Sequence, residues 1–129
     1  MSTRSQQLML LAEKLVSQVQ KEEKALIDAY GRLCFTFPVL VQQSGLCQAI
    51  AFSLDKARSD EERESHRAQA HRLLLDHVAV VLNTAPGDLG RAVAEMDLGE
   101  YMLSTRIVLD AWVYFRRFAV SILKVKSAG

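Results

Sequence analysis

Residues 30–52 read YGRLCFTFPVLVQQSGLCQAIAF, and this stretch decides the fold. Residues 33–41 are almost continuously apolar, a composition typical of a protein core or an interface. Pro38 has no N–H to donate, so we expect it to begin a helix or to kink one. Gly45 can adopt the positive φ that ends one helix before Leu46 begins the next. The stretch therefore predicts two short apolar helices broken at Pro38 and Gly45, and its composition indicates packing rather than chemistry.

Helical patterns continue on both sides of this stretch. Apolar side chains recur at helical spacing from residue 8 to residue 19. Residues 61–72 are charged almost all round, and residues 73–82 are mostly apolar. Helix-capping residues occur at Ser2 or Thr3, at Ser59 with Glu62 (a capping box that announces a long helix), at Asp88, and at Asp97 with Glu100. We predict an all-α fold, a compact single-domain bundle of about five or six helices over residues 1–129.

The last predicted helix, residues 98–124, is the clearest amphipathic element. Its apolar stripe contains Tyr101, Val108, Trp112, Phe115, Ala119 and Ile122. On the opposite face, Arg106, Arg117 and Lys124 fall within about 20° of one another on a helical projection. Arg116 lies on the border between the two faces. We therefore expect one side of this helix to pack into the core and the other to present a basic row.

The charge of the chain is uneven along its length. Sixteen basic and fifteen acidic residues give a net charge of +1, which excludes a generic polyanion binder. Residues 1–54 carry five basic and four acidic groups, residues 55–100 six and ten, and residues 101–129 five and one. The acidic middle and the basic C-terminal helix could also be complementary faces between neighbouring copies of the chain.

The sequence offers little for catalysis or for metal binding. The histidines, at positions 66, 71 and 77, are spaced by five and six residues, so no pair shares a helix face as metal ligands would. The carboxylates at 60–64 are explained by a helix N-terminus. We read His77 as a hydrogen-bonded core residue and Cys34 and Cys47 as buried reduced thiols. The prediction is a protein with no enzymatic activity, no metal and no cofactor.

The N-terminus has no signal-peptide character, and no apolar run approaches the roughly 18–20 residues that span a bilayer. We therefore expect a cytoplasmic protein that does not contact a membrane. Phe35, Phe37 and Val41 are expected in the core, although a partner interface would suit the same side chains.

The chain resembles the small-subunit family of the type III-B CRISPR–Cas effector, the Cmr complex. The resemblance spans nearly the whole sequence, and it rests on the order and spacing of packing motifs rather than on any one of them. These motifs are Thr3-Arg4-Ser5-Gln6, Tyr30-Gly31, Pro38-Val39-Leu40, Gly45-Leu46, Ala51-Phe52, Tyr101-Met102, Thr105-Arg106, Ala111-Trp112 and Arg116-Arg117-Phe118-Ala119.

The resemblance implies a helical bundle without an active site. It also implies several copies stacked head to tail beside the larger subunits that hold the guide RNA, where they support target RNA binding in antiviral defence while other subunits cleave. A guide-programmed complex reads sequence by base pairing, so this subunit should contact the backbone of the guide–target duplex. The residues expected to face RNA are Arg106, Arg116, Arg117 and Lys124, with Arg4 and Lys14 as further candidates.

Three other interpretations remain open from the sequence. The chain could be a helical protein–protein adaptor with no RNA contact, or the small subunit of the related type III-A complex. It could also be a small helical enzyme that uses His71 or His77 with a nearby carboxylate. The basic residues could equally form an ordinary solvated face or hold a neighbouring subunit.

Overall fold

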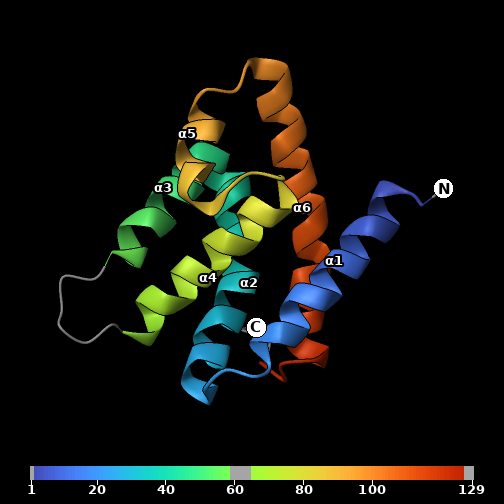
Figure 1. The fold of residues 1–129 in the computed structure, drawn as a ribbon, viewed down its shortest axis with the longest axis vertical. Coiled ribbons are helices and arrows are strands. Elements are labelled where there is room, and N and C mark those ends of the chain that lie inside the picture. Colours follow the sequence, from blue (N-terminus) through green and yellow to red (C-terminus); the bar gives the residue numbers. More distant parts are fainter. Residues whose placement is uncertain (1, 59–64, 127–129) are drawn as a thin grey trace.

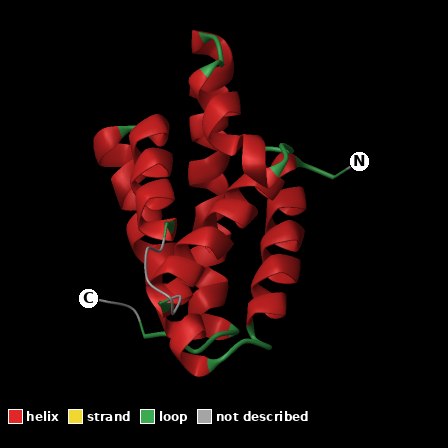
Figure 2. Cartoon of the chain, turned by 60° about the vertical axis from the view of Figure 1, so that its left-hand side comes forward, coloured by secondary structure: helices red, strands yellow, loops and turns green. Residues whose placement is uncertain are grey.

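The computed structural model describes residues 2–58 and 65–126. The described part contains six α-helices and one short 3₁₀ turn, and no strand (Figure 1; Figure 2). In chain order these are α1 (Arg4–Val19), α2 (Lys24–Ser44), α3 (Leu46–Ala57), α4 (His66–Val81), η1 (Pro86–Asp88), α5 (Leu89–Ala94) and α6 (Leu98–Ser121). The all-α prediction is confirmed. No helix among these residues is long and apolar enough to cross a membrane.

The helix α2 lies at the centre of the bundle. It packs against α3, α4 and α6, while α1 lies across α6 on one side and α3 pairs with α4 on the other (Figure 1). The short α5 contacts α3 and leads into the turn before α6. This turn and the start of α6 form the upper end of the molecule in Figure 1. Every helix therefore buries one face, as the apolar stripes of the sequence require.

The core is built on aromatic side chains from α2 and α6. The ring of Trp112 stacks on Phe115 at a centroid distance of 4.3 Å, and Phe37 meets Trp112 edge-on at 5.2 Å. All three are buried, as are Phe35 and Val41, so the expectation that Phe35, Phe37 and Val41 lie in the core is confirmed. Burying each such side chain contributes about 1.5–3 kcal/mol, and favourable ring geometry adds to this.

The helix α2 runs through Pro38 without interruption, so the predicted break at that residue is wrong. A proline inside a helix removes one backbone hydrogen bond, at a cost of about 3 kcal/mol. Burial of side chains from both halves of α2 outweighs that cost. Gly45 does end the helix as predicted: its φ is 89°, and its N–H donates to the carbonyl of Val41 at 2.9 Å.

Three predicted helix starts are found where they were expected, although Asp88 precedes α5 without the side-chain cap. Thr3 caps α1, and Asp97 caps α6 by accepting a hydrogen bond from the N–H of Glu100 at 2.8 Å. Asp88 forms no side-chain cap; it ends the 3₁₀ turn that leads into α5.

The fourth predicted start, the capping box at Ser59 and Glu62, lies outside the described residues. The helix α4 that follows begins at His66. Ser65 has an extended backbone there, and its hydroxyl accepts a hydrogen bond from the N–H of Ala68 at 3.1 Å. Ser65 is therefore the cap of α4, a role that we did not predict.

The segment after α6 folds back onto α2 at Gly31. Val125 is buried there, and its N–H donates to the carbonyl of Ala119 at 3.0 Å. A Cβ atom added to Gly31 would lie only 2.3 Å from a methyl carbon of Val125. A β-branched side chain held in a core has little freedom to move away. Gly31 is therefore required for close packing of the C-terminal segment.

We expect Gly31→Ala to lower the free energy of unfolding by about 1–3 kcal/mol, because the new methyl group overpacks the contact. Val125→Ala makes room for that methyl group, so adding Gly31→Ala to this background should cost much less. Urea unfolding of the two single variants and the double variant measures the coupling. Equal costs in both backgrounds would contradict the assigned contact.

Candidate nucleic-acid interface

The face of α6 opposite the core carries both cations and apolar side chains. Arg106 and Arg117 are exposed there, as the sequence predicts. Val113 and Val120 are exposed between and beside them. We call these four residues the outer face of α6. The valines were not predicted because the expected face was defined by its charges alone, and their exposure suits a protein contact as well as an RNA contact.

Asp110 lowers the net charge beside the outer face of α6. Its carboxylate accepts a hydrogen bond from Arg4 across the α1–α6 contact, with an Nη2–Oδ2 distance of 2.6 Å. Arg106, one turn earlier on α6, approaches the other carboxylate oxygen to 3.6 Å. All three side chains are substantially exposed, so the ion pairs contribute about 0–1 kcal/mol to stability. Arg4 and Arg106 are thus brought together, but one carboxylate already neutralises part of their charge.

The structure separates the remaining predicted RNA-facing residues from the outer face of α6. Lys124 was expected on the helix in line with Arg106 and Arg117, but α6 ends at Ser121 and Lys124 has a left-handed backbone with φ of 60°. The helix ends early because Leu123 and Val125 turn inward to be buried. Lys124 is exposed beyond the helix and does not continue the row.

Arg116 and Lys14 do not belong to the outer face of α6. The guanidinium of Arg116 sits over the ring of Phe35 at 5.3 Å, where cation–π attraction holds it. Lys14 is exposed on a different helix, α1. Arg106 and Arg117, with Arg4 close to the first, are therefore the part of the predicted set that the fold brings to one side.

A groove that was not predicted opens between α2, α3, α4 and α6. Its cavity volume is about 740 Å³, and its lining is mostly apolar, with Phe35, Leu40 and Phe52 among the contributors. Three cations also line it: Arg32 from α2, Arg67 from α4 and Arg116 from α6. We call this hollow the arginine groove. No signal in the sequence indicates it, because its residues come from four helices and no periodic pattern connects them.

Two histidines are buried in hydrogen bonds to hydroxyl groups. The hydroxyl of Tyr30 lies 2.6 Å from Nδ1 of His77, and the hydroxyl of Ser53 lies 3.2 Å from Nδ1 of His71. Burial lowers the pKa of both imidazoles to about 4; nearby cations on α3 and α4 add to the effect at His71. Both rings are therefore neutral at pH 7. The prediction of a core, hydrogen-bonded His77 is confirmed.

The two cysteines differ in their surroundings. Cys34 is buried as predicted, and burial raises the pKa of its thiol to about 12, so the thiol is protonated at pH 7. Cys47 is exposed, which corrects the expectation of two buried thiols. It occupies the first turn of α3 on the side away from the buried Leu46 and Ala49. Its N–H donates to the hydroxyl of Tyr101 at 3.1 Å, which ties the start of α3 to α6.

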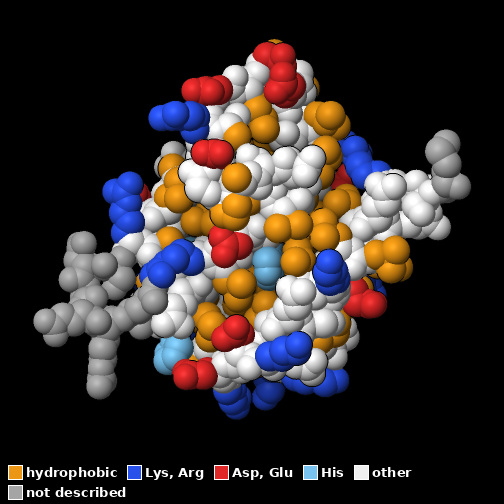
Figure 3. Space-filling model, in the orientation of Figure 1, with side chains coloured by type: hydrophobic (Ala, Val, Ile, Leu, Met, Phe, Trp, Pro, Cys, Tyr) orange, Lys and Arg blue, Asp and Glu red, His pale blue; other side chains and the backbone are white. Residues whose placement is uncertain are grey.

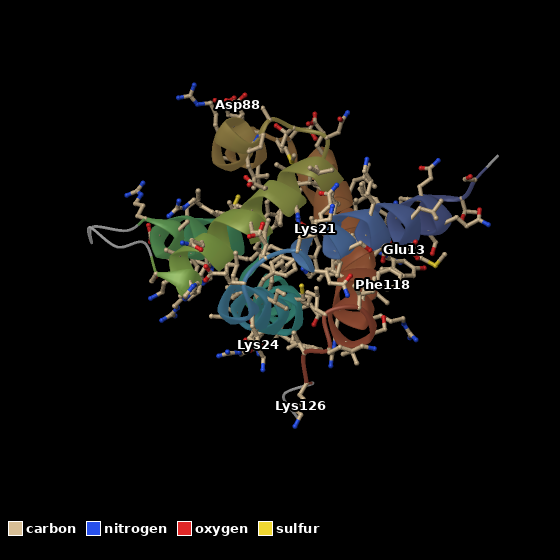
Figure 4. All side chains as sticks on the ribbon, turned by 60° about the horizontal axis from the view of Figure 1, so that its bottom comes forward. Glu13, Lys21, Lys24, Asp88, Phe118 and Lys126 are labelled. Carbon is tan, nitrogen blue, oxygen red and sulfur yellow. The ribbon has the colours of Figure 1, made fainter. Side chains whose placement is uncertain are left out.

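Acidic side chains are concentrated at one end of the molecule, while charges of both signs are spread over the rest of the surface (Figure 3). In Figure 3, acidic side chains gather at the upper end, over α5 and the start of α6. Figure 4 shows Asp88 on the side of the molecule away from Lys24 and Lys126. Within the described residues, no group of three or more histidine, cysteine or carboxylate side chains is placed to hold a metal ion.

Comparison with known proteins agrees with the motifs and with the fold. The family model described as CRISPR-associated protein (Cas_Cmr5) matches residues 4–122. The chain belongs to the Cmr5 family. A protein of Thermus thermophilus named CRISPR system Cmr subunit Cmr5 is 34% identical over 125 residues, which cover 96% of this chain and 99% of that protein. The resemblance to the small-subunit family of the type III-B effector is confirmed.

A solved structure extends the Cmr5 relationship to three dimensions. The crystal structure of a CRISPR-associated Cmr5 family protein from Thermus thermophilus superposes with a TM-score of 0.77 at 35% sequence identity. The superposition covers 95% of this chain and 99% of that structure. The helical arrangement described above is thus shared by the two proteins.

The buried His77 predicts a loss of stability in mild acid. An unfolded histidine has a pKa near 6.5, whereas His77 in the folded chain has a pKa of about 4. Between these values the unfolded chain binds a proton that the folded chain does not, so the free energy of unfolding decreases as pH falls from about 6.5 to about 4. The stabilising effect of the neutral ring is fully present above pH 6.5.

His77→Gln keeps a hydrogen-bond acceptor for Tyr30 but cannot titrate. We expect its loss of stability between pH 7 and pH 4.5 to be smaller than that of the natural chain by about 1–2 kcal/mol in urea unfolding. His66→Gln, which removes an exposed imidazole, is the matched control. The same pH dependence in His77→Gln and in the natural chain would contradict the assignment.

Proposed function

We propose that this Cmr5 family member is the non-catalytic small subunit of a type III-B CRISPR effector that acts in the cytoplasm. Several copies stack beside the larger subunits that hold the guide RNA, and they support binding of the target RNA through backbone contacts. The outer face of α6, with Arg4 beside it, supplies those contacts. The family assignment carries the first part of this proposal, and the exposed Arg106 and Arg117 opposite the core carry the second.

The chemistry of the outer face of α6 suits a contact that does not depend on sequence. Arginine guanidinium groups bind phosphate oxygens, and such contacts position a protein on RNA without reading its bases. The described part of this face carries no aromatic side chain on which bases could stack. Base pairing to the guide supplies the sequence specificity that these side chains lack.

A second function is favoured by one observation. Val113 and Val120 are exposed among the arginines, and apolar side chains next to cations are common where proteins meet. The outer face of α6 would then hold a larger subunit, and the chain would be an adaptor with no RNA contact. Arg106 and Arg117 would surround an apolar contact instead of a phosphate backbone.

The double variant Arg106→Ala and Arg117→Ala, called the outer-face variant, separates the two functions. In a complex reconstituted with its partner subunits and a guide RNA, we expect weaker retention of a complementary target RNA. We also expect the log–log slope of binding against salt to fall by about 0.7 for each phosphate that the variant no longer neutralises. Filter binding of labelled target RNA over a salt series measures both quantities.

The control variant Lys21→Ala and Lys24→Ala removes the same charge from exposed positions elsewhere. It should leave both quantities unchanged. If the outer-face variant assembles normally and retains target RNA like the control, the RNA contact is wrong and the adaptor function stands. If it fails to assemble, the face holds a subunit.

Asp110→Asn provides a test in the opposite direction. Removing this carboxylate frees Arg4 and Arg106 from their shared ion pair, so both guanidinium groups become available to phosphates. We expect target RNA to be retained severalfold more tightly at a given salt concentration. Asp55→Asn, an exposed carboxylate on α3, is the control. Unchanged or weaker retention in Asp110→Asn would remove Arg4 and Arg106 from the RNA contact.

A further inference from the structure

The arginine groove combines an apolar floor with charge of one sign. Its lining includes exposed or partly exposed apolar side chains such as Val39, Leu40 and Phe52. Arg32, Arg67 and Arg116 supply the charge, and no aspartate or glutamate belongs to the described lining. An occupant with an apolar surface and acidic side chains around it would satisfy both features of the groove.

Such a surface exists at the upper end of the same molecule. Around the start of α6, the side chains of Leu98, Met102 and Leu103 are 74%, 63% and 53% exposed. Exposed carboxylates surround them at Glu95, Asp97 and Glu100. We call these six residues the acidic tip. Large apolar side chains left this open to solvent on consecutive turns of one helix indicate an interaction site.

The acidic tip also shows the electrostatic cost of crowding carboxylates. Asp97 raises the pKa of the Glu100 carboxyl, mainly through repulsion between the two like charges. A cation brought close to the tip would relieve that repulsion. The tip therefore favours a basic partner, as the arginine groove favours an acidic one.

We propose that the acidic tip of one copy docks in the arginine groove of a second copy. This inference rests on the proposed function, in which several copies stack in one complex, and it names the surfaces that meet. Leu98 and Met102 would contact the apolar floor, and the carboxylates of Glu95 and Glu100 would face the arginines. Asp97 keeps its role as the cap of α6.

The positions of the two surfaces favour a second copy as the occupant. They share no residue, so one chain presents both at the same time. The tip lies at the upper end of the molecule in Figure 1, whereas the groove is lined mainly by α2, with contributions from α3, from α4 and from Arg116 of α6. Contact between two different patches is heterologous, so it continues from copy to copy instead of stopping at a symmetric dimer.

This arrangement gives Arg116 and Arg117 different partners although they are neighbours in sequence. Arg116 points over Phe35 at the groove, so it would meet the next copy. Arg117 lies on the outer face of α6 and remains available to RNA or to a larger subunit. Contact with another copy and contact with RNA would therefore use arginines on two different faces of α6 and would not compete for the same side chains.

Complementation between two variants tests the contact. The groove variant carries Arg32→Glu and Arg67→Glu; the tip variant carries Leu98→Lys and Glu100→Lys. All four positions are exposed, so both variants should keep the helical content and unfolding midpoint of the natural chain. Sedimentation velocity over a concentration series measures self-association of each purified protein and of their equimolar mixture.

We expect the natural chain to associate progressively with concentration, and each variant alone to associate about tenfold more weakly or less. The mixture should form one-to-one dimers and nothing larger, because only the intact tip of the groove variant can enter the intact groove of the tip variant. Matched controls are Leu10→Lys with Glu13→Lys for the tip and Lys21→Glu with Lys24→Glu for the groove. Both controls should associate like the natural chain.

Several results would overturn the contact. These are a natural chain that stays monomeric at its highest soluble concentration, variants that associate like their controls, or a mixture that forms no dimer. Loss of association in the groove variant alone would assign the groove to another acidic partner. Failure here is distinct from failure of the proposed function, because the outer-face variant tests target RNA retention with the tip and groove intact.

Discussion

Burial of α2 between α4 and α6 is the constraint on which the rest of the structure depends. One helix of 21 residues supplies aromatic rings to the centre, and the neighbouring helices are arranged around it. Because side chains on both sides of Pro38 are buried, the helix continues through this residue. The same burial also explains Gly31, where any side chain would displace Val125, and the buried hydrogen bond that joins Tyr30 to His77. The Tyr-Gly pair is thus a packing motif with two separate physical roles.

Because both buried histidines are neutral at pH 7, the core carries no net charge from them and ionised groups are left to the surface. Those groups are not evenly mixed. Carboxylates and apolar side chains share the acidic tip, arginines and apolar side chains share the groove, and arginines with valines share the outer face of α6. Three surfaces that each combine charge with apolar area are characteristic of a protein built to contact neighbours.

Much of the fold could be predicted from sequence because helical periodicity and capping are local signals. Pro38 was misjudged because tertiary packing can outweigh local propensity, and Lys124 because burial of the segment after α6 ends that helix early. The candidate site was predictable only where a single helix forms it. The pairing of Arg4 with Asp110 joins residues 106 positions apart, and the arginine groove depends on four helices. The prediction that Cys47 is buried was wrong because its apolar neighbours in the sequence do not share its side of α3.

Under the proposed function, a subunit that repeats along a guide–target duplex faces two requirements that one surface cannot meet together. The contact between copies must be specific, which requires apolar shape and paired charges; the contact with RNA must tolerate any sequence, which requires exposed cations free to meet phosphates. Helix α6 presents different arginines on different sides, which is the geometry that the proposed function requires. Arg116 is held against an aromatic ring at a hollow, and Arg117 is left in solvent one residue later. The 100° step of an α-helix therefore places adjacent identical residues on two separate surfaces of the molecule.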